Sequence, residues 1–202
     1  IASDFFAGNP FKAIPAMVIS ACMNTNPVMI YFGQELGEKG MDEEGFSGRD
    51  GRTTIFDWWS VASIRRLRKL IASGKYRSSS VSELVENGLM KEEAELFLRF
   101  TEAVRFAAED CSIRQGTTYD LCYCNMSSDG FDKNRHFVFL RDYEEHTLLI
   151  AANFSNREAV MKLVIPEHAF EWMGIPKTEA LHPGKVIEVK VQPMDGAIVT
   201  LI

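Results

Sequence analysis

The stretch Asn26-Pro-Val-Met-Ile-Tyr-Phe-Gly-Gln-Glu-Leu-Gly37 decides the fold class of this chain. Its apolar run, Val28–Phe32, predicts a buried strand, which ends where Gly33-Gln-Glu35 opens a long loop rich in glycine and charge. A buried strand that runs into such a loop is typical of the functional rim of a parallel α/β sheet or barrel. We therefore expect the loop over residues 33–57 to carry function.

Composition and charge limit the class of protein. The chain has 202 residues, of which 46% are hydrophobic and 25% are charged, and its net charge is −6. This length allows one large or two small domains, and the acidic balance argues against a nucleic acid or an anionic membrane as the main partner. The longest apolar run is too short to span a bilayer. Because the chain begins with Ile1 and has no signal-peptide pattern, we expect it to start inside a longer protein.

The first half of the chain predicts helices on both sides of the long loop. Apolar residues recur there at helical spacing, and each segment is bounded by capping residues or glycine. The expected helices run from Pro10 to about Asn24, from Ser60 to about Gly74, from Ser80 to about Asn87 and from Lys91 to about Ile113. The basic face of the second helix is expected to be solvated rather than to bind nucleic acid.

After Gly116 the pattern changes to short β-rich runs separated by turn residues. The clearest run, Val186–Gln192, alternates apolar and polar residues, and such a series of runs indicates an antiparallel sandwich or barrel. The runs are Tyr119–Tyr123, Phe137–Leu140, Thr147–Ala152, Val160–Ile165, Ile187–Val191 and Ile198–Ile202. We predict an α+β chain with one domain over residues 1–115 and an all-β domain over residues 116–202.

The order of these motifs resembles the C-terminal part of the alpha-amylase superfamily, glycoside hydrolase family 13. In that family the last barrel strand commonly ends in Tyr-x-Gly-x-Glu, here Tyr31-Phe-Gly-Gln-Glu35, and the next loop often carries an Arg-Asp-x-x-Arg-Thr-like segment, here the shorter Arg49-Asp-Gly-Arg-Thr53. His136–Arg141 and Thr147–Ser155 are similar to the family's C-terminal β domain, where a strand with arginine pairs with one that ends in Asn-Phe-Ser. The resemblance implies the end of a TIM (β/α)8 barrel followed by an antiparallel β-sandwich.

The resemblance also implies a function, a glycosidase that acts on α-linked glucans. The catalytic carboxylates of the family lie on earlier strands, and this chain has no His-Asp pair, so Asp4 is not assigned a catalytic role and the chain alone is expected to be inactive. The expected partners are the missing N-terminal part of the barrel and an α-glucan oligosaccharide, and no cofactor or metal is expected. Because a lone barrel strand has no ladder partner, the chain is expected to rearrange, to form a homodimer through exposed apolar surface, or to pair this strand with another chain.

Three residues of the strand and loop are candidates for substrate binding: Glu35, Arg49 and Arg52. Glu35 can orient an arginine or a neighbouring loop, or contact sugar directly. Arg49 and Arg52 can donate forked hydrogen bonds to sugar hydroxyls or to a carboxylate. The alternative for the two arginines is a salt bridge with Asp50 or Asp57 that ties the loop together.

Other chemically active side chains are given structural roles. Trp58 and Trp59 are expected to pack in the core rather than on a sugar, and the acidic run 42–44 is expected to be solvated rather than to bind calcium. The cysteines are expected to be free thiols that act as small hydrophobic residues. The histidines are expected to be ordinary surface or strand residues with no serine, cysteine or carboxylate arranged around them for catalysis. These residues are Cys22, Cys111, Cys122, Cys124, His136, His146, His168 and His182.

Two other functions remain open at the level of the sequence. The β domain would be a carbohydrate-binding module if a row of aromatic side chains were exposed on one face, and Tyr119, Tyr123, Tyr143 and Trp172 are the candidates, although Tyr119 and Tyr123 fit a core equally well. Alternatively, the chain belongs to a non-catalytic scaffold with an amylase-like tail.

Overall fold

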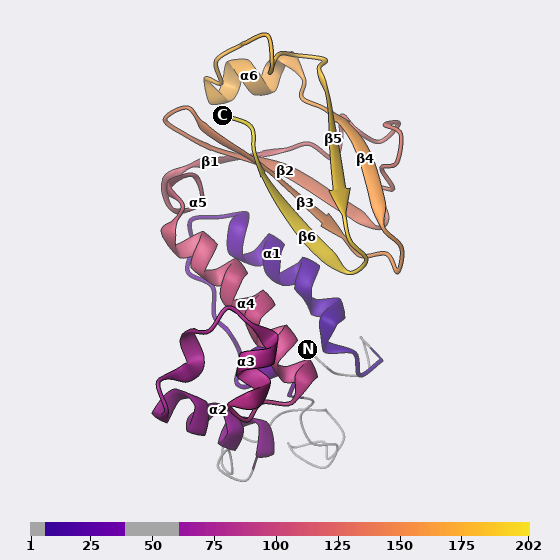
Figure 1. Cartoon of the computed structure of the whole chain (residues 1–202). Coiled ribbons are helices and arrows are strands. Elements are labelled where there is room, and N and C mark those ends of the chain that lie inside the picture. The colour runs from indigo at the N-terminus through magenta and orange to yellow at the C-terminus, as the bar shows by residue number, and fades with distance from the viewer. Residues whose placement is uncertain (1–6, 39–60) are drawn as a thin grey trace, which may run out of the picture. The chain divides into compact units, whose positions relative to one another are not determined.

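The computed structural model describes residues 7–38 and 61–202, which form two compact units (Figure 1). The first unit contains residues 7–13 and the described residues between Met29 and Glu102. The second contains residues Ile14–Val28 and Ala103–Ile202. Each unit has its own core, and they are described separately.

The first unit is helical. Its elements are η2 (Pro10–Ala13), η3 (Gln34–Leu36), α2 (Ala62–Ala72), η4 (Lys75–Arg77), α3 (Val81–Glu86) and the beginning of α4 (Lys91–Glu109). The helix predicted over about Ser80–Asn87 is confirmed as α3, and Ser80 caps it, because its hydroxyl accepts a hydrogen bond from the backbone N–H of Glu83. The buried core of this unit consists of Leu36, Ile64, Leu70, Leu84, Leu89 and Ala94.

Three details of α2 differ from the prediction. The N-cap residue is Val61 rather than Ser60. Leu70 is fully buried, whereas Ile71, whose helical spacing from Ile64 and Leu67 predicts a place on the apolar face, is 50% exposed. Arg66 does not lie on a solvated basic face but pairs with Glu93.

The second unit is built on β-sheets. A four-stranded antiparallel sheet has the order β1-β2-β3-β6, and a two-stranded antiparallel sheet pairs β4 with β5. The strands are β1 (Thr117–Asp120), β2 (His136–Tyr143), β3 (His146–Asn153), β4 (Ala159–Val164), β5 (Val186–Val191) and β6 (Asp195–Thr200). Five of the six β-rich runs predicted after Gly116 are therefore confirmed as strands, whereas the run Tyr119–Tyr123 is a strand only up to Asp120 and continues as a turn.

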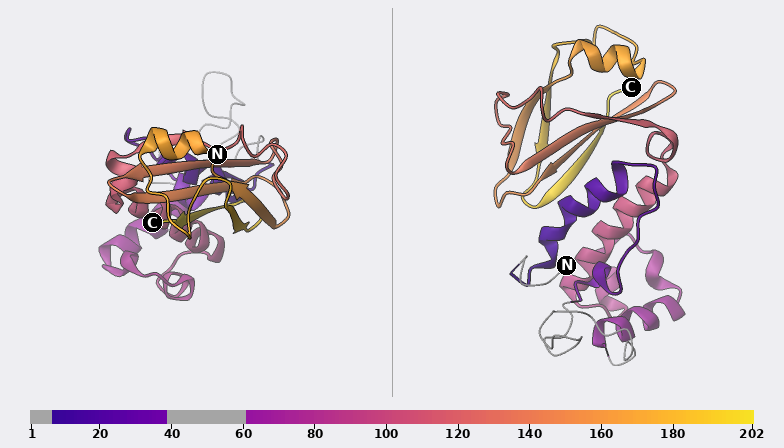
Figure 2. Two further views of the ribbon diagram at one scale, coloured as in Figure 1. Left: turned by 90° about the horizontal axis from the view of Figure 1, so that it is seen from above. Right: turned by 180° about the vertical axis from the view of Figure 1, so that it is seen from behind.

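Both faces of the four-stranded sheet are covered. Helix α1 (Ile14–Cys22) packs on β3 and β6, and a Cβ on Gly196 would lie only 2.7 Å from Cγ1 of Val18 (Figure 1). On the opposite face, Leu140 and Leu149 share one core with Met161 of β4 and Val189 of β5. Figure 2 shows the two sheets and α1 from two further directions. Burial on both faces explains why β3 is apolar along nearly its whole length.

The helix predicted over about Lys91–Ile113 is broken at Asp110. Helix α4 ends at Glu109, and Asp110 caps the separate short helix α5 (Cys111–Gln115) with hydrogen bonds from the backbone N–H groups of Ser112 and Ile113. A further helix, α6 (Glu167–Met173), follows Pro166 and was not predicted. Among the helices that the structure describes, none combines the length and the apolar character needed to cross a membrane.

The buried strand predicted at Val28–Phe32 is wrong for this chain. Residues 28–31 have no regular secondary structure, and Phe32 lies in a turn. Met29 is 85% exposed and Tyr31 is 47% exposed. A parallel strand exists only by hydrogen bonding to neighbouring strands, and within the described residues no other segment pairs with this one.

Candidate functional site

The residues that follow the predicted strand form a tight turn. The Tyr31 carbonyl accepts from the backbone N–H of Gln34 at 3.0 Å, and the Gln34 side chain accepts from the Tyr31 N–H at 3.1 Å. Gly33 and Gly37 both have φ of +71°, which glycine adopts without strain, and they bound η3. Ser63 closes the turn by donating to the Glu38 carboxylate at 2.8 Å. This geometry fixes the position of Glu35.

The carboxyl group of Glu35 is the most unusual feature of this turn. Its Oε2 atom is buried and has no hydrogen-bond partner among the described residues. Burial raises the pKa of Glu35, although a hydrogen bond from its own backbone N–H acts in the opposite direction. An unpaired buried carboxylate oxygen is costly, so this side chain is suited to receive a hydrogen-bond donor.

The other two predicted substrate-binding residues lie outside the described residues. Arg49 and Arg52 belong to the segment 39–60, as do Trp58, Trp59 and the acidic run 42–44. Their expected roles in sugar binding, loop stabilisation and packing therefore stay predictions. Of the candidate site residues, Glu35 alone has a described position.

In the second unit, an aromatic cluster of Tyr119, Tyr123, His168 and Trp172 lies beside β1 and α6. The Tyr119 ring is 6.2 Å from the Tyr123 ring and 5.9 Å from the Trp172 ring, measured between centroids. Its hydroxyl lies 2.5 Å from the Tyr123 hydroxyl and 3.0 Å from Nδ1 of His168. Tyr119 is buried, whereas Tyr123 and Trp172 are 53% and 55% exposed. The buried ring thus supports two exposed rings, and rings of this kind are able to stack on a sugar face.

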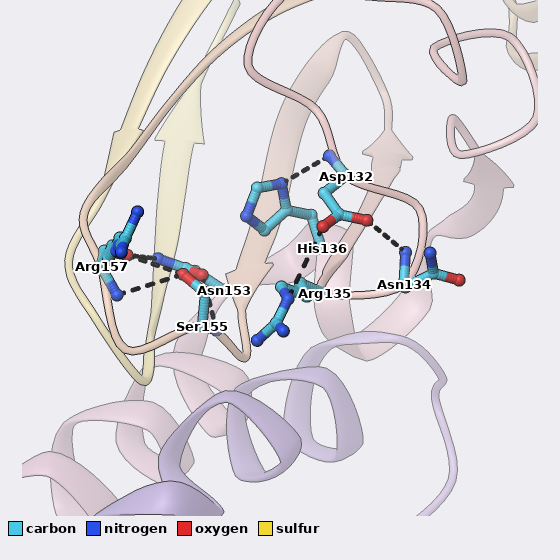
Figure 3. Close-up of polar contacts among 7 residues, drawn as sticks. All are labelled: Asp132, Asn134, Arg135, His136, Asn153, Ser155 and Arg157. Atoms are coloured by element: carbon cyan, nitrogen blue, oxygen red, sulfur yellow. Dashed lines mark hydrogen bonds and ion pairs between the residues drawn. The ribbon is translucent and has the colours of Figure 1, made fainter.

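A polar hollow of about 620 Å³ lies at the end of β3, where Asp132, Arg135, His136, Ser155 and Arg157 gather (Figure 3). Burial lowers the pKa of His136, and its Nδ1 accepts a hydrogen bond from the Asp132 backbone N–H at 2.9 Å. The Ser155 hydroxyl donates to the Arg157 carbonyl at 2.7 Å. The side chains of Asp132, His136 and Ser155 therefore bind loop backbone.

Asn153, which is fully buried, binds the loop that carries Ser155 and Arg157 of this hollow. Its amide donates to the carbonyls of Arg157 at 2.8 Å and Gln192 at 3.1 Å, and its Oδ1 accepts from the Ser155 N–H at 2.9 Å. The Asn-Phe-Ser sequence at the end of β3 is therefore a loop anchor. The expected pairing of an arginine-containing strand with the strand that ends in this sequence is confirmed, because Arg141 of β2 lies opposite Leu148 of β3.

One group was missed by the sequence prediction. His146 was expected to have no reactive neighbours, but the structure places it beside Asp110 and Cys111. This expectation was wrong because the break at Asp110 and the hairpin between β2 and β3 bring together residues far apart in the sequence. All four cysteines are free thiols, as predicted, although Cys122 and Cys124 lie in a turn rather than on a strand.

The fold is similar to part of the solved structures of a debranching enzyme and of AmyP, although no protein-family model and no curated protein matches the sequence. The structure of a Nostoc punctiforme debranching enzyme soaked with acarbose matches 96% of this chain with 14% identity and a TM-score of 0.50. AmyP in complex with maltose matches 96% of this chain, with 9% identity and a TM-score of 0.57. An AmyP variant in complex with maltotriose also matches 96% of this chain, with 12% identity and a TM-score of 0.52. The chain spans 30% and 35% of the length of the debranching enzyme and AmyP, or about a third. The predicted resemblance is therefore confirmed at the level of the fold.

Proposed function

We propose that this chain is the C-terminal part of an alpha-amylase-type glycosidase that acts on α-linked glucans. Its catalytic carboxylates lie upstream, so the chain alone does not catalyse hydrolysis. The observation that carries the proposal is the match of 96% of the chain to about a third of AmyP, which was crystallised with maltose. The motif order, from the Tyr-x-Gly-x-Glu turn to the Asn-Phe-Ser loop, agrees with it.

In this proposal, residues 1–115 are the end of a (β/α)8 barrel and residues 116–202 are a β-sandwich domain that stabilises it. The exposed apolar residues of the segment before Gly33 support the idea that upstream strands cover it. Their exposed fractions are 40% for Met23, 37% for Val28, 85% for Met29 and 47% for Tyr31. Several exposed apolar side chains in one short segment are unusual on a surface that no other part of the protein covers. In the chain alone, the same segment is available for a homodimer contact.

Glu35 supports the proposal that this turn and the loop after it help to shape the sugar cleft. Its buried, unpaired oxygen calls for a donor that the described residues do not supply. We assign that role to a donor from the upstream barrel. In this arrangement Glu35 positions its partner, and Arg49 and Arg52 bind sugar hydroxyls of the glucan.

The test is a comparison of this chain with the longer protein encoded by its gene. The upstream region is expected to supply an Asp nucleophile, a Glu acid/base and a second Asp after a His-Asp pair, and the longer protein is expected to hydrolyse maltoheptaose while this chain does not. Sugar release would be followed by chromatography. An upstream barrel without these carboxylates would reject the glycosidase and favour the non-catalytic scaffold.

A second candidate function, carbohydrate binding by the β domain, is favoured by the aromatic cluster. Titration of this chain with maltoheptaose, followed by tryptophan fluorescence, is expected to give a saturable change if Trp172 stacks on sugar. Trp172→Ala is expected to abolish the fluorescence change. Trp172→Phe is expected to retain sugar binding, which calorimetry would measure because this variant lacks the indole at position 172. A response that survives Trp172→Ala would place the sugar elsewhere.

A further inference from the structure

Three side chains that can bind metals meet where α4 ends. Asp110 and Cys111 lie at the break between α4 and α5, and His146 is the first residue of β3. One carboxylate oxygen of Asp110, the sulfur of Cys111 and one ring nitrogen of His146 all lie within 4.8 Å of one another. His146 Nε2 and Asp110 Oδ2 are 3.0 Å apart.

The local structure holds these groups in place from both sides. The second oxygen of Asp110 accepts hydrogen bonds from the backbone N–H groups of Ser112 at 2.9 Å and Ile113 at 3.2 Å, which fixes the orientation of the carboxylate. The Ser112 hydroxyl donates to the His146 carbonyl at 2.5 Å and so ties α5 to the start of β3. Hydrogen bonds that orient a ligand in this way accompany most metal sites in proteins.

The hairpin before His146 fixes the position of the third side chain, His146 itself. Tyr143 pairs with His146 across two residues, Glu144 and Glu145, which both have positive φ, at 48° and 68°. Two successive residues of this kind form the tight turn that matches the twist of paired strands. The two glutamates also place negative charge next to the group.

We propose that Asp110, Cys111 and His146 form a binding site for a zinc ion. Carboxylate oxygen, thiolate and imidazole are the donors that zinc takes in tetrahedral sites, with distances of about 2.0–2.3 Å. Two nitrogen or oxygen ligands at about 2.05 Å on a tetrahedral ion are about 3.3 Å apart, close to the observed 3.0 Å between Nε2 and Oδ2.

Charge and exposure fit the same ion. One carboxylate, one thiolate and one neutral imidazole balance the two positive charges of zinc, whereas magnesium and calcium prefer oxygen ligands alone. The Asp110 and His146 side chains are 12% and 34% exposed, so the site is open to solvent and water takes the fourth position. Because thiolate is the form of cysteine that binds metals, binding deprotonates the Cys111 thiol.

The experiment is a titration of the metal-free 202-residue chain with zinc in competition with a chromophoric chelator. We expect one zinc ion per chain and a rise in melting temperature, because the ion binds only the folded state. Cys111→Ser and His146→Gln are expected to weaken zinc binding by about 10-fold or more, since even the loss of an orienting contact costs that much. Cobalt(II) in place of zinc is expected to give a thiolate charge-transfer band that Cys111→Ser removes.

Matched controls separate this site from the other thiols and histidines. Cys124→Ser and His182→Gln should leave zinc affinity unchanged, because Cys124 lies in a turn of the β unit and His182 is exposed on a loop outside the group. Circular dichroism would check that each variant is folded. Absence of zinc binding, a cobalt complex without the thiolate band, or unchanged affinity in Cys111→Ser would overturn the proposal.

Discussion

The guanidinium of Arg141 donates a hydrogen bond to the backbone carbonyl of Met23, 118 positions earlier in the sequence, with Nη1 and the oxygen 3.3 Å apart. Arg141 is only 2% exposed, and its other N–H groups bind the carbonyls of Ser112 at 3.0 Å and Ile113 at 2.7 Å. It also donates to the Thr118 hydroxyl. One side chain on β2 therefore satisfies carbonyls beyond the end of α1 and in α5, where helices leave such groups unpaired.

Arg141→Met is expected to lower the free energy of unfolding by about 3 kcal/mol, because three carbonyls lose a charged donor and methionine offers none in return. Urea denaturation followed by circular dichroism measures the change. Arg105→Met, at an exposed position of α4, is the matched control and should change stability by less than about 0.5 kcal/mol. Equal effects of the two substitutions would show that the buried contacts contribute nothing.

Asn125 provides a second test of buried polar contacts. Its amide donates to the Val164 carbonyl at 3.0 Å, its Oδ1 accepts from the Val164 N–H at 2.8 Å, and it is fully buried. Asn125→Ala is expected to cost about 3 kcal/mol because both groups of Val164 lose their partner. Asn134→Ala, at an exposed position, should be nearly neutral in the same denaturation experiment. A small loss in Asn125→Ala would mean that water replaces the side chain.

The strands after Gly116 could be predicted from sequence because local patterns determine them. Val186–Gln192 alternates apolar and polar residues, and the structure buries Val189 and Val191 while Glu188 and Lys190 stay exposed. The capped helix at Ser80 is a second local case. In both, the information that fixes the element lies within a few residues.

The failures have a different origin, since they depend on distant partners. Val28–Phe32 has the composition of a strand, but a parallel strand needs neighbouring strands that the described residues do not include. Asp110 was placed inside one helix because its neighbours keep helical spacing, and its capping bonds end α4 instead. The group of Asp110, Cys111 and His146 has no sequence signature, because a hairpin and a helix break create it. The sequence singles out Glu35 as a candidate, but only the coordinates reveal a carboxylate oxygen without a partner among the described residues.

Arg66 and Glu93 form a two-point ion pair that should make stability depend on pH. Nε of Arg66 donates to Oε2 at 2.8 Å and Nη2 to Oε1 at 2.5 Å. Burial alone would raise the pKa of Glu93, but hydrogen bonds from Arg66 and the Met90 N–H outweigh it, so this pKa is lowered. The pair therefore stabilises the fold above the unfolded carboxyl pKa of about 4.3, and this contribution is lost as pH falls through the folded value.

Arg66→Ala is expected to reduce the free energy of unfolding at pH 7 by about 2 kcal/mol, because it leaves Glu93 without its main partner. The difference from the unmodified chain should shrink below pH 4, where Glu93 becomes protonated. Urea denaturation at several pH values measures both effects. Arg65→Ala removes an exposed charge from the same helix and serves as the control. A loss of stability that stays constant down to pH 3 would contradict the ion-pair explanation.

Glu35 should show the opposite dependence on pH. Because burial raises its pKa in the folded chain, the ionised carboxylate costs stability, and this cost grows as pH rises from about 4.3 through the folded value. Glu35→Gln cannot ionise, so it is expected to stabilise the chain by about 1 kcal/mol at pH 7 and to make no difference below pH 4. Glu86→Gln, at an exposed position of α3, is the control in the same denaturation series.

If this chain is part of a longer protein, as proposed, that protein should respond in the opposite direction to the same Glu35→Gln substitution. If the upstream barrel supplies a donor to Oε2, the carboxylate is paired there, and removing its charge is expected to destabilise the protein by about 1–3 kcal/mol at pH 7. Thermal unfolding of the two proteins and their Glu35→Gln variants measures the change of sign. Stabilisation in both proteins would show that Glu35 remains unpaired in the barrel, and the proposed positioning role would then be wrong.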